Sequence, residues 1–364
     1  MSYNILGIAP AHNSSICILS DGEIVYFLEE ERLSKVKRDG NPFTVINNII
    51  KKYKIDEIAL AGVNYQSMAL IQTEEDLYYG IVRKHYPEVK FSYLGDIHHK
   101  THSFSSFYNS GFSNALSIVI DGNGSEKIHN FNSQYIKSDE IESIIIHKYP
   151  SNNTIFNSTQ LSYKLEKNIC IENYNILNSI GIGKSYEAIS EYLGFKRNEG
   201  GKTMGLSSYG KKNDNIPTIV SKNFRNKKLF KYDLSEGCQQ PHIKNKILNK
   251  YSPEDVAWKI QNDTQTLVGD YIENALQKTG IKQICCSGGY FLNCVANYYL
   301  IKRFSNIEFY FEPISNDAGT SIGAAKLAWH ETTQDTTIRP QKTLYYGPKY
   351  TKDQLIEGIK KYTN

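Results

Sequence analysis

The sequence predicts an α/β protein made of two duplicated lobes with a nucleotide bound between them. The chain opens with three short apolar strand-like segments, at residues 5–8, 15–19 and 24–28. Asp21-Gly22, between the second and third, is typical of a tight hairpin turn. A second start follows at residues 115–120, where another apolar strand ends in an Asp-Gly turn. Alternating helical and extended patterns follow the first start, which indicates an α/β fold.

The remaining elements follow from periodicity and capping residues. We expect helices at residues 43–52, 74–85 and 98–108, and strands at 57–62, 140–146 and 284–286. Ser252 should cap a long helix whose apolar stripe runs through Val256, Ile260, Leu267, Tyr271 and Leu276. Residues 211–250 are polar and should be irregular. We therefore expect a first lobe over residues 1–114, a second lobe over 115–331 with the adenosine and metal segments, and a linker with a short helix over 332–364.

Composition narrows the function classes. The 364 residues have a net charge of +4, which is compatible with a polyanionic partner but does not indicate one. No apolar stretch approaches the roughly 20 residues that span a bilayer, so we expect no membrane partner. The N-terminus shows no secretory signal, and four of the cysteines lie in apolar segments, which indicates reduced thiols and a cytoplasmic protein. A homodimer is compatible with the sequence.

Three of the nine histidines lie within residues 98–102. Side chains four residues apart share one face of a helix, so His98 and His102 can ligate one metal ion. The alternative is a helix that carries scattered surface histidines. Asp317 is a candidate third ligand, because it follows an extended segment and precedes small residues that allow a helix to pack closely. The alternative for Asp317 is a helix cap.

Two glycine turns follow apolar strands. Residues 121–124 contain Gly122 and Gly124, and residues 287–289 contain Gly288 and Gly289. Glycine there allows backbone N–H groups to approach a phosphate or ribose, although many ordinary turns read Asp-Gly. His12 lies in the first hairpin loop, where a catalytic role competes with that of an ordinary solvated histidine.

Six ordered segments together resemble the carbamoyltransferases of antibiotic, toxin and nodulation-factor biosynthesis (the NodU/CmcH type). The segments are residues 7–19, the run EERLSKVKRD at 30–39, HHKTH with FYNSGF at 98–112, NEGGKTMGLSSYG at 198–210, GGYFLNCVAN at 288–297, and DAGT at 317–320. Arg38 stands where the family usually has histidine. The resemblance runs from end to end and is far more specific than any single segment.

The resemblance implies the two-lobed actin/hexokinase/Hsp70-like (ASKHA) nucleotide-binding fold. It also implies an O-carbamoyltransferase related to the universal tRNA threonylcarbamoyl transferase. In the family, a YrdC-like domain makes carbamoyl-adenylate from ATP and carbamoyl phosphate, and the N-terminal domain passes the carbamoyl group to a hydroxyl. The sequence stops where that second domain would begin. We therefore expect either a piece of a longer protein or a single-domain member that obtains carbamoyl-adenylate from a separate YrdC-like partner.

The same resemblance implies roles for single residues. A divalent metal, iron by resemblance, would be held by His98, His102 and Asp317, and His12 would act as the general base. Lys37, Gly122 and Gly124 would balance charge on the departing AMP. The adenosine would be held by Gly288, Gly289 and Asn293, and Lys202 is a candidate for the phosphates unless it is a salt-bridged structural lysine.

The acceptor and two rival functions remain open. The hydroxyl can belong to a small metabolite, a sugar or a hydroxymethylated base in DNA, and a basic chain with 27 tyrosines suits the last through stacking and phosphate contacts. One rival is a transferase that modifies adenosine in tRNA, which the segments at residues 30–32 and 198–210 disfavour. The other is a nucleotide-binding regulatory protein without activity, which the retained ligand types and His12 disfavour.

Overall fold

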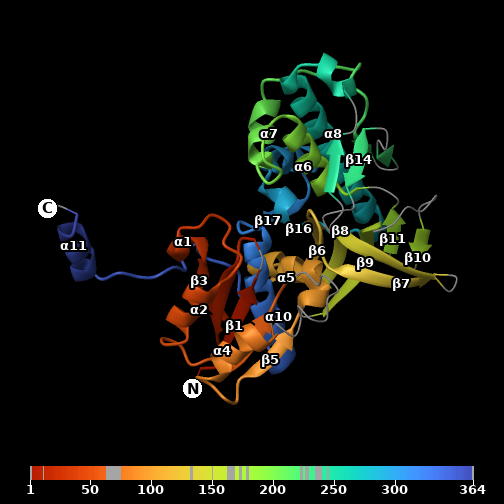
Figure 1. Ribbon diagram of the computed structural model, residues 1–364. Coiled ribbons are helices and arrows are strands. Elements are labelled where there is room, and N and C mark those ends of the chain that lie inside the picture. The colour runs from red at the N-terminus through yellow and green to blue at the C-terminus, as the bar shows by residue number, and fades with distance from the viewer. Residues whose placement is uncertain are drawn as a thin grey trace.

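Two large sheets, two short two-stranded sheets and the helices around them make up the part of the chain that the computed structural model describes (Figure 1). The described residues are 2–10, 12–62, 75–131, 134–149, 151–161, 169–171, 174–177, 180–221, 224–225, 229–233, 240–243 and 246–362. Residue 74, the expected first residue of a helix, lies outside them, as does part of the expected irregular region at 211–250.

The first sheet has five strands in the order β3-β2-β1-β4-β5. Their bounds are β1 Asn4–Ala9, β2 Ser15–Ser20, β3 Glu23–Glu29, β4 Glu57–Leu60 and β5 Lys90–Tyr93. β1 and β2 are buried along nearly their whole length, which explains their continuous apolar runs. Asp21 and Gly22 both have positive φ, of 48° and 84°, and form the tight turn that joins β2 to β3.

The second sheet repeats the pairing pattern of the first. Its strand order is β10-β11-β9-β8-β6-β16-β17, with β7 paired to β8. The bounds are β6 Asn114–Ile120, β7 Glu126–Phe131, β8 Gln134–Lys148, β9 Ser151–Leu161, β10 Ile169–Ile171, β11 Tyr174–Leu177, β16 Gln283–Ser287 and β17 Glu308–Phe311. Across β9-β8-β6-β16-β17 the pairs are antiparallel, antiparallel, parallel and parallel, as they are across β3-β2-β1-β4-β5. The repeat confirms the prediction of duplicated lobes.

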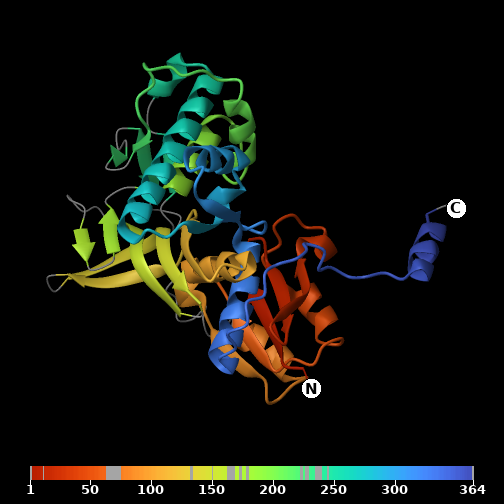
Figure 2. The same cartoon turned by 180° about the vertical axis from the view of Figure 1, so that it is seen from behind.

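Helices α5 (His98–Ser110) and α10 (Thr320–Thr333) pack against each other between the two sheets (Figures 1 and 2). α5 also contacts β6 and β16 of the second sheet, whereas α10 contacts β1, β2 and β4 of the first. The helix at the end of each expected lobe therefore contacts both lobes, and the polar groups at the start of each helix lie where the lobes meet.

Contact between these helices depends on glycine. A Cβ built on Gly323 of α10 would lie 1.8 Å from the Thr101 carbonyl oxygen of α5, and one on Gly7 of β1 would lie 2.0 Å from the Ser321 carbonyl oxygen. No side chain fits at such distances, so these glycines set how closely α10 approaches its neighbours.

The other helices lie beside the sheets. Beside the first sheet are α1 Glu31–Ser34, α2 Phe43–Ile49, a π-helical turn at Glu75–Tyr79 and α4 Gly80–Arg83. Beyond the second sheet are α6 Ile182–Tyr192, α7 Gly200–Ser207, α8 Pro253–Thr279 and α9 Cys294–Arg303, with the short strands β12 Val220–Ser221, β13 Phe224–Arg225, β14 Phe230–Asp233 and β15 Gln240–Ile243. The helix expected at 43–52 ends at Ile49, and the one expected over 74–85 is a π-helical turn followed by a single α-helical turn.

The long helix predicted after Ser252 is confirmed. The Ser252 hydroxyl accepts a hydrogen bond from the Asp255 N–H at 3.1 Å, and α8 ends at Thr279, followed by the capping residue Gly280 with φ of 67°. Of its predicted stripe, Val256, Ile260, Leu267 and Tyr271 are buried and Leu276 is partly buried.

After α10 the chain returns along the first sheet, where the Phe27 N–H donates to the Tyr346 carbonyl, and then extends to α11 (Lys352–Lys360), which stands away from the rest (Figures 1 and 2). The short terminal helix is thus confirmed. None of the helices among the described residues is long and apolar enough to cross a membrane.

The close approach of α10 to α5 predicts opposite effects for two helical Gly→Ala substitutions. Alanine favours a helix over glycine by about 1 kcal/mol. In Gly205→Ala of α7 the new methyl group meets open space, so we expect stability to be unchanged or slightly increased. In Gly323→Ala it meets the Thr101 carbonyl, so we expect a net loss of about 1–3 kcal/mol. Urea unfolding of both variants measures this, and a Gly323→Ala protein as stable as Gly205→Ala contradicts the packing described.

Candidate active site

The start of α5 is fixed by hydrogen bonds. The Ser125 hydroxyl accepts from the His98 N–H at 3.1 Å and donates to the Gly95 carbonyl at 2.6 Å. The Ser287 hydroxyl donates to the His102 carbonyl at 3.0 Å, which joins the helix to the end of β16. The first turn of α5 therefore has a defined position relative to the second sheet, and its two histidines project from it together.

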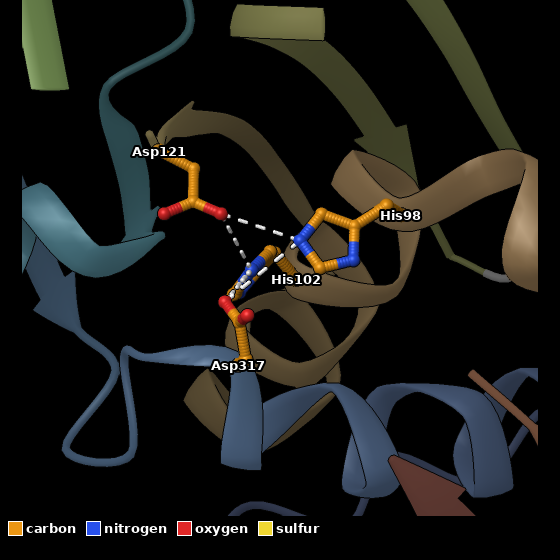
Figure 3. Close-up of side chains that lie close together, drawn as sticks. All are labelled: His98, His102, Asp121 and Asp317. Carbon is orange, nitrogen blue, oxygen red and sulfur yellow. Dashed lines mark hydrogen bonds and ion pairs between the residues drawn. The ribbon is translucent and has the colours of Figure 1, made fainter. Parts of the chain in front are cut away.

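His98 and His102 lie side by side with their Nε2 atoms directed at the same place (Figure 3). The rings are perpendicular with centroids 4.7 Å apart, and both residues are about 1% exposed. The His98 Nδ1 lies 3.0 Å from the Gly62 carbonyl oxygen, which can only accept a hydrogen bond. Nδ1 of His98 therefore carries the proton in the neutral ring, and its Nε2 has a lone pair free for a cation.

Two carboxylates complete what we call the His–Asp group: His98, His102, Asp121 and Asp317. Asp121 follows the last residue of β6, and Asp317 begins the 3₁₀ turn before α10. Asp121 Oδ2 lies 3.2 Å from His98 Nε2 and 3.6 Å from His102 Nε2. Asp317 Oδ1 lies 3.9 and 3.6 Å from the same two atoms. One ligand atom of each of the four residues lies within 4.8 Å of every other.

Burial and charge act in opposite directions on this group. Burial by itself lowers the pKa of His102, but the carboxylates of Asp121 and Asp317 raise it to about 9. Burial would raise the pKa of Asp121, yet His102 and His98 hold it well below the usual range. The pKa of Asp317 is also lowered, because His102, His12 and His98 outweigh burial and the charge of Asp121. Without another cation, the carboxylates need protonated imidazole to compensate them.

The donor set fits a divalent first-row metal. Two imidazoles and two carboxylates suit iron, manganese, cobalt or zinc. His102 Nε2 is buried with no hydrogen-bond partner in the described structure, because 3.6 Å to each carboxylate is too long for a hydrogen bond. An unsatisfied buried nitrogen facing two carboxylates is the arrangement that a cation would satisfy.

The group lies at the edge of a cleft of about 610 Å³ that both lobes line, a size typical of small-molecule sites. Asp121 and Asp317 line it, whereas the two histidines lie behind them. His12, from the loop between β1 and β2, reaches over the cleft with its Nε2 3.5 Å from Asp317 Oδ2. The Asp317 carboxylate raises the pKa of His12, which makes its imidazole a stronger base.

The second-lobe side of the cleft contains a small, rigid polar network. Asn293 caps α9 by accepting from the Ala296 N–H at 3.0 Å, and its amide pairs with that of Gln261 of α8 at 2.8 and 3.3 Å. Gln261 also accepts from the Tyr186 hydroxyl at 2.8 Å. The Gly289 N–H donates to Asp121 Oδ1 at 3.2 Å. Because these groups are fixed without a ligand, they form a preformed surface.

The expected site residues fall into two sets. The structure places His12, Lys37, Gly122, Gly289, Asn293 and Asp317 around the cleft. Gly124 does not line it, because it packs against the His99 ring and Glu140. Gly288 packs against the Ile120 backbone with φ of 92°, so it shapes the turn after β16. Lys202 Nζ is 2.9 Å from Glu199 Oε2 and is exposed, which is the geometry of a salt-bridged surface lysine.

Two residues at the site escaped the sequence reasoning. The sequence places Asp121 in a glycine turn, and its position directly after an apolar strand is the signal that indicates a second carboxylate. Lys184 of α6 is buried beside the same turn, with its Nζ 3.1 Å from Glu187 Oε2. Gly183 lets α6 approach this turn, because a Cβ there would lie 2.6 Å from the Asp121 carbonyl oxygen. No periodicity in the sequence indicates that contact.

Comparison with known proteins identifies a family. A family model described as "Carbamoyltransferase N-terminus" matches residues 52–326. Nodulation protein NolNO of Sinorhizobium fredii is 22% identical over 384 residues, which cover 95% of this chain and 50% of that protein. An uncharacterized protein of Synechocystis is 24% identical over 425 residues, covering 98% of this chain and 62% of the relative. The chain thus spans about half to three-fifths of the length of these relatives.

Solved structures agree on the fold. Full-length HypF in its phosphate- and nucleotide-bound form has a TM-score of 0.57 at 15% identity, over 91% of this chain and 56% of that one. HypF of T. kodakarensis has a TM-score of 0.53 at 12% identity, over 91% and 48%. The chain has the two-lobed actin/hexokinase/Hsp70-like fold that the sequence predicted.

The His–Asp group predicts that the protein binds about one first-row divalent metal ion per chain. Replacing both histidines, in His98→Ala/His102→Ala, should remove most of it, and Asp121→Asn should weaken it. Elemental analysis of protein purified without chelator measures the content. His85→Ala, at an exposed histidine outside the group, is the matched control and should keep the metal. Full metal content in the double variant shows that the metal lies elsewhere.

Proposed function

This chain belongs to the carbamoyltransferase family of the NodU type, and on that premise we propose that it is an O-carbamoyltransferase. It transfers a carbamoyl group from carbamoyl-adenylate, made from carbamoyl phosphate and ATP, to a hydroxyl of an acceptor. The observation that carries the proposal is the placement of His12 and the His–Asp group on one cleft, opposite a preformed polar surface. A base, a charged group and a surface for the donor are the parts that acyl transfer requires.

His12 is the proposed general base. Its imidazole takes the proton of the acceptor hydroxyl while the hydroxyl oxygen attacks the carbamoyl carbon. The carbon–oxygen bond to the AMP phosphate then breaks, and AMP leaves with the bonding electron pair. Asp317 supports this role, because its carboxylate lies 3.5 Å from His12 Nε2 and stabilises the imidazolium that forms.

The remaining cleft residues hold the donor and balance charge. Lys37 lies on the first-lobe side and offsets negative charge on the departing AMP. The backbone at Gly122 allows close approach to the phosphate. Gly289 and Asn293 also line the cleft and are the residues that we assign to the adenosine. Lys184, buried beside Gly122 and paired with Glu187, has its ammonium group next to the proposed phosphate position.

His98, His102, Asp121 and Asp317 are the proposed metal ligands, with iron the metal that the resemblance implies. When bound there, a divalent ion supplies Lewis acidity next to the carbonyl and phosphate oxygens. The side chains of the group provide its charge balance, since two carboxylates offset the two charges of the ion.

The acceptor is a compound with a hydroxyl group: a small metabolite, a sugar or a hydroxymethylated base in DNA. Mass spectrometry after incubation with the donor and a panel of these acceptors tests the assignment by a product heavier by one carbamoyl group. A carbamoylated tRNA adenosine as the product would replace this function with that of a tRNA-modifying transferase.

The assigned base predicts a separation of binding from chemistry. His12→Asn should bind adenine nucleotide as the unchanged protein does, and it should lose carbamoyl transfer by roughly 10²- to 10⁴-fold. Calorimetry and a product assay measure the two effects, with His85→Asn as a control. Transfer within a few-fold of the unchanged protein would mean that the acceptor loses its proton another way, and lost nucleotide binding would make His12 a binding residue.

The origin of the donor gives another prediction. The cleft holds a finished mixed anhydride with AMP as its leaving group, whereas making that anhydride needs an additional activating site. This chain alone should therefore be slow with carbamoyl phosphate and ATP, and prepared carbamoyl-adenylate or a YrdC-like partner should restore transfer. Turnover by the chain alone at about 1 s⁻¹ or faster from carbamoyl phosphate and ATP would contradict the division of labour.

A further inference from the structure

A hydrogen bond crosses the cleft between the two lobes. The Arg38 guanidinium donates from Nη2 to the Asn198 carbonyl oxygen at 2.6 Å, across 160 residues of sequence. Arg38 follows α1 beside the first sheet, and Asn198 lies between α6 and α7 of the second lobe. Both residues line the cleft. The bond therefore joins the two sides of the cavity in which the donor is proposed to lie.

The backbone of Arg38 is held in a conformation that few residues other than glycine adopt. Its φ is 61°, and that of Lys35 in the same loop is 60°. Such conformations are strained and persist where the surroundings fix them. Here the Arg38 N–H donates to Glu31 Oε2 at 2.9 Å, and the next residue, Asp39, accepts from the Ser14 N–H at 3.1 Å. The loop is thus fixed with the Arg38 side chain across the cleft.

The receiving segment is also fixed within its own lobe. Arg197 pairs with Glu191 of α6 at 2.8 Å. The Lys196 N–H donates to Glu199 Oε2 at 3.1 Å, and the Glu199 N–H donates back to the Lys196 carbonyl at 2.9 Å. The loop that carries Arg38 and the segment that carries Asn198 are each held by their own lobe. Breaking the Arg38–Asn198 bond therefore allows the lobes to separate and leaves both segments in place.

The charges around Arg38 also distinguish it from the other arginines of the cleft. Arg32 lies near the carboxylates of Glu29 and Glu31, and Arg197 pairs with Glu191. Among the described residues, the Arg38 side chain has no carboxylate partner and bonds to a neutral carbonyl. A single charge-assisted hydrogen bond of this kind is strong enough to favour the closed arrangement and weak enough to break in each turnover.

We propose that Arg38 is a positioning residue that keeps the cleft closed over the donor nucleotide through its bond to the Asn198 carbonyl. This inference rests on the proposed function, because it requires the donor nucleotide to bind between the lobes. Apparent affinity is the intrinsic affinity reduced by the fraction of molecules in the closed form. Arg38 therefore strengthens nucleotide binding without contacting the nucleotide.

Calorimetric titration of purified full-length protein with AMP and with adenosine tests this. Arg38→Met should weaken both ligands by a similar factor, on the order of 5- to 10-fold. Arg38→Lys, which keeps a donor, should lose less. Arg83→Met, on α4, is a control outside the cleft lining.

The outcomes separate this proposal from the proposed function. Equal binding by Arg38→Met and the unchanged protein overturns it. A loss confined to AMP overturns it too, because Arg38 would then contact the phosphate directly. The proposal is supported if Arg38→Met loses similar affinity for AMP and adenosine, if Arg38→Lys recovers part of it, and if the unfolding temperature is unchanged. This result supports the proposal even if no carbamoyl transfer is found.

Discussion

Two buried carboxylates that face each other at the junction of the lobes constrain the rest of this structure. Asp121 follows β6 of the second sheet, and Asp317 precedes the helix that packs on the first. Placing two like charges together away from water costs several kcal/mol unless positive charge compensates them. His98 and His102 provide that compensation when protonated, and a divalent cation would provide it with both histidines neutral. The site therefore has a physical reason to bind metal that is independent of any resemblance.

The fold brings these residues together by duplication and close packing. Each lobe contributes one helix to the junction, α5 after the first sheet and α10 after the second, and the two helices contact each other. Contact this close between α5 and α10 requires Gly323, and the approach of α10 to β1 requires Gly7, because a methyl group at either position would overlap a backbone carbonyl. The site and the α5–α10 interface thus depend on the same packing, and residues of both lobes line the cleft next to the site.

Sequence reasoning recovered the parts of this arrangement that leave a local pattern. Residue spacing within a single element predicts the first strands, the capped helix α8 and the two histidines on one face of α5. Contacts between distant elements leave no such pattern. Nothing local indicates that Gly124 packs on His99, that Lys184 lies beside Gly122, or that Arg38 reaches Asn198. The strands β7 and β9 also went unpredicted, because their polar sequences lack the alternation that marks a half-buried strand.

Anomalous X-ray diffraction from crystals grown with AMP tests the central claim, that the His–Asp group binds a metal at the edge of a nucleotide cleft. The account predicts one anomalous peak within about 2.0–2.2 Å of His98 Nε2, His102 Nε2 and a carboxylate oxygen of each aspartate. It also predicts AMP density between Gly122 and Asn293. Metal bound elsewhere, or AMP bound outside the cleft beside a metal-free His–Asp group, would contradict it.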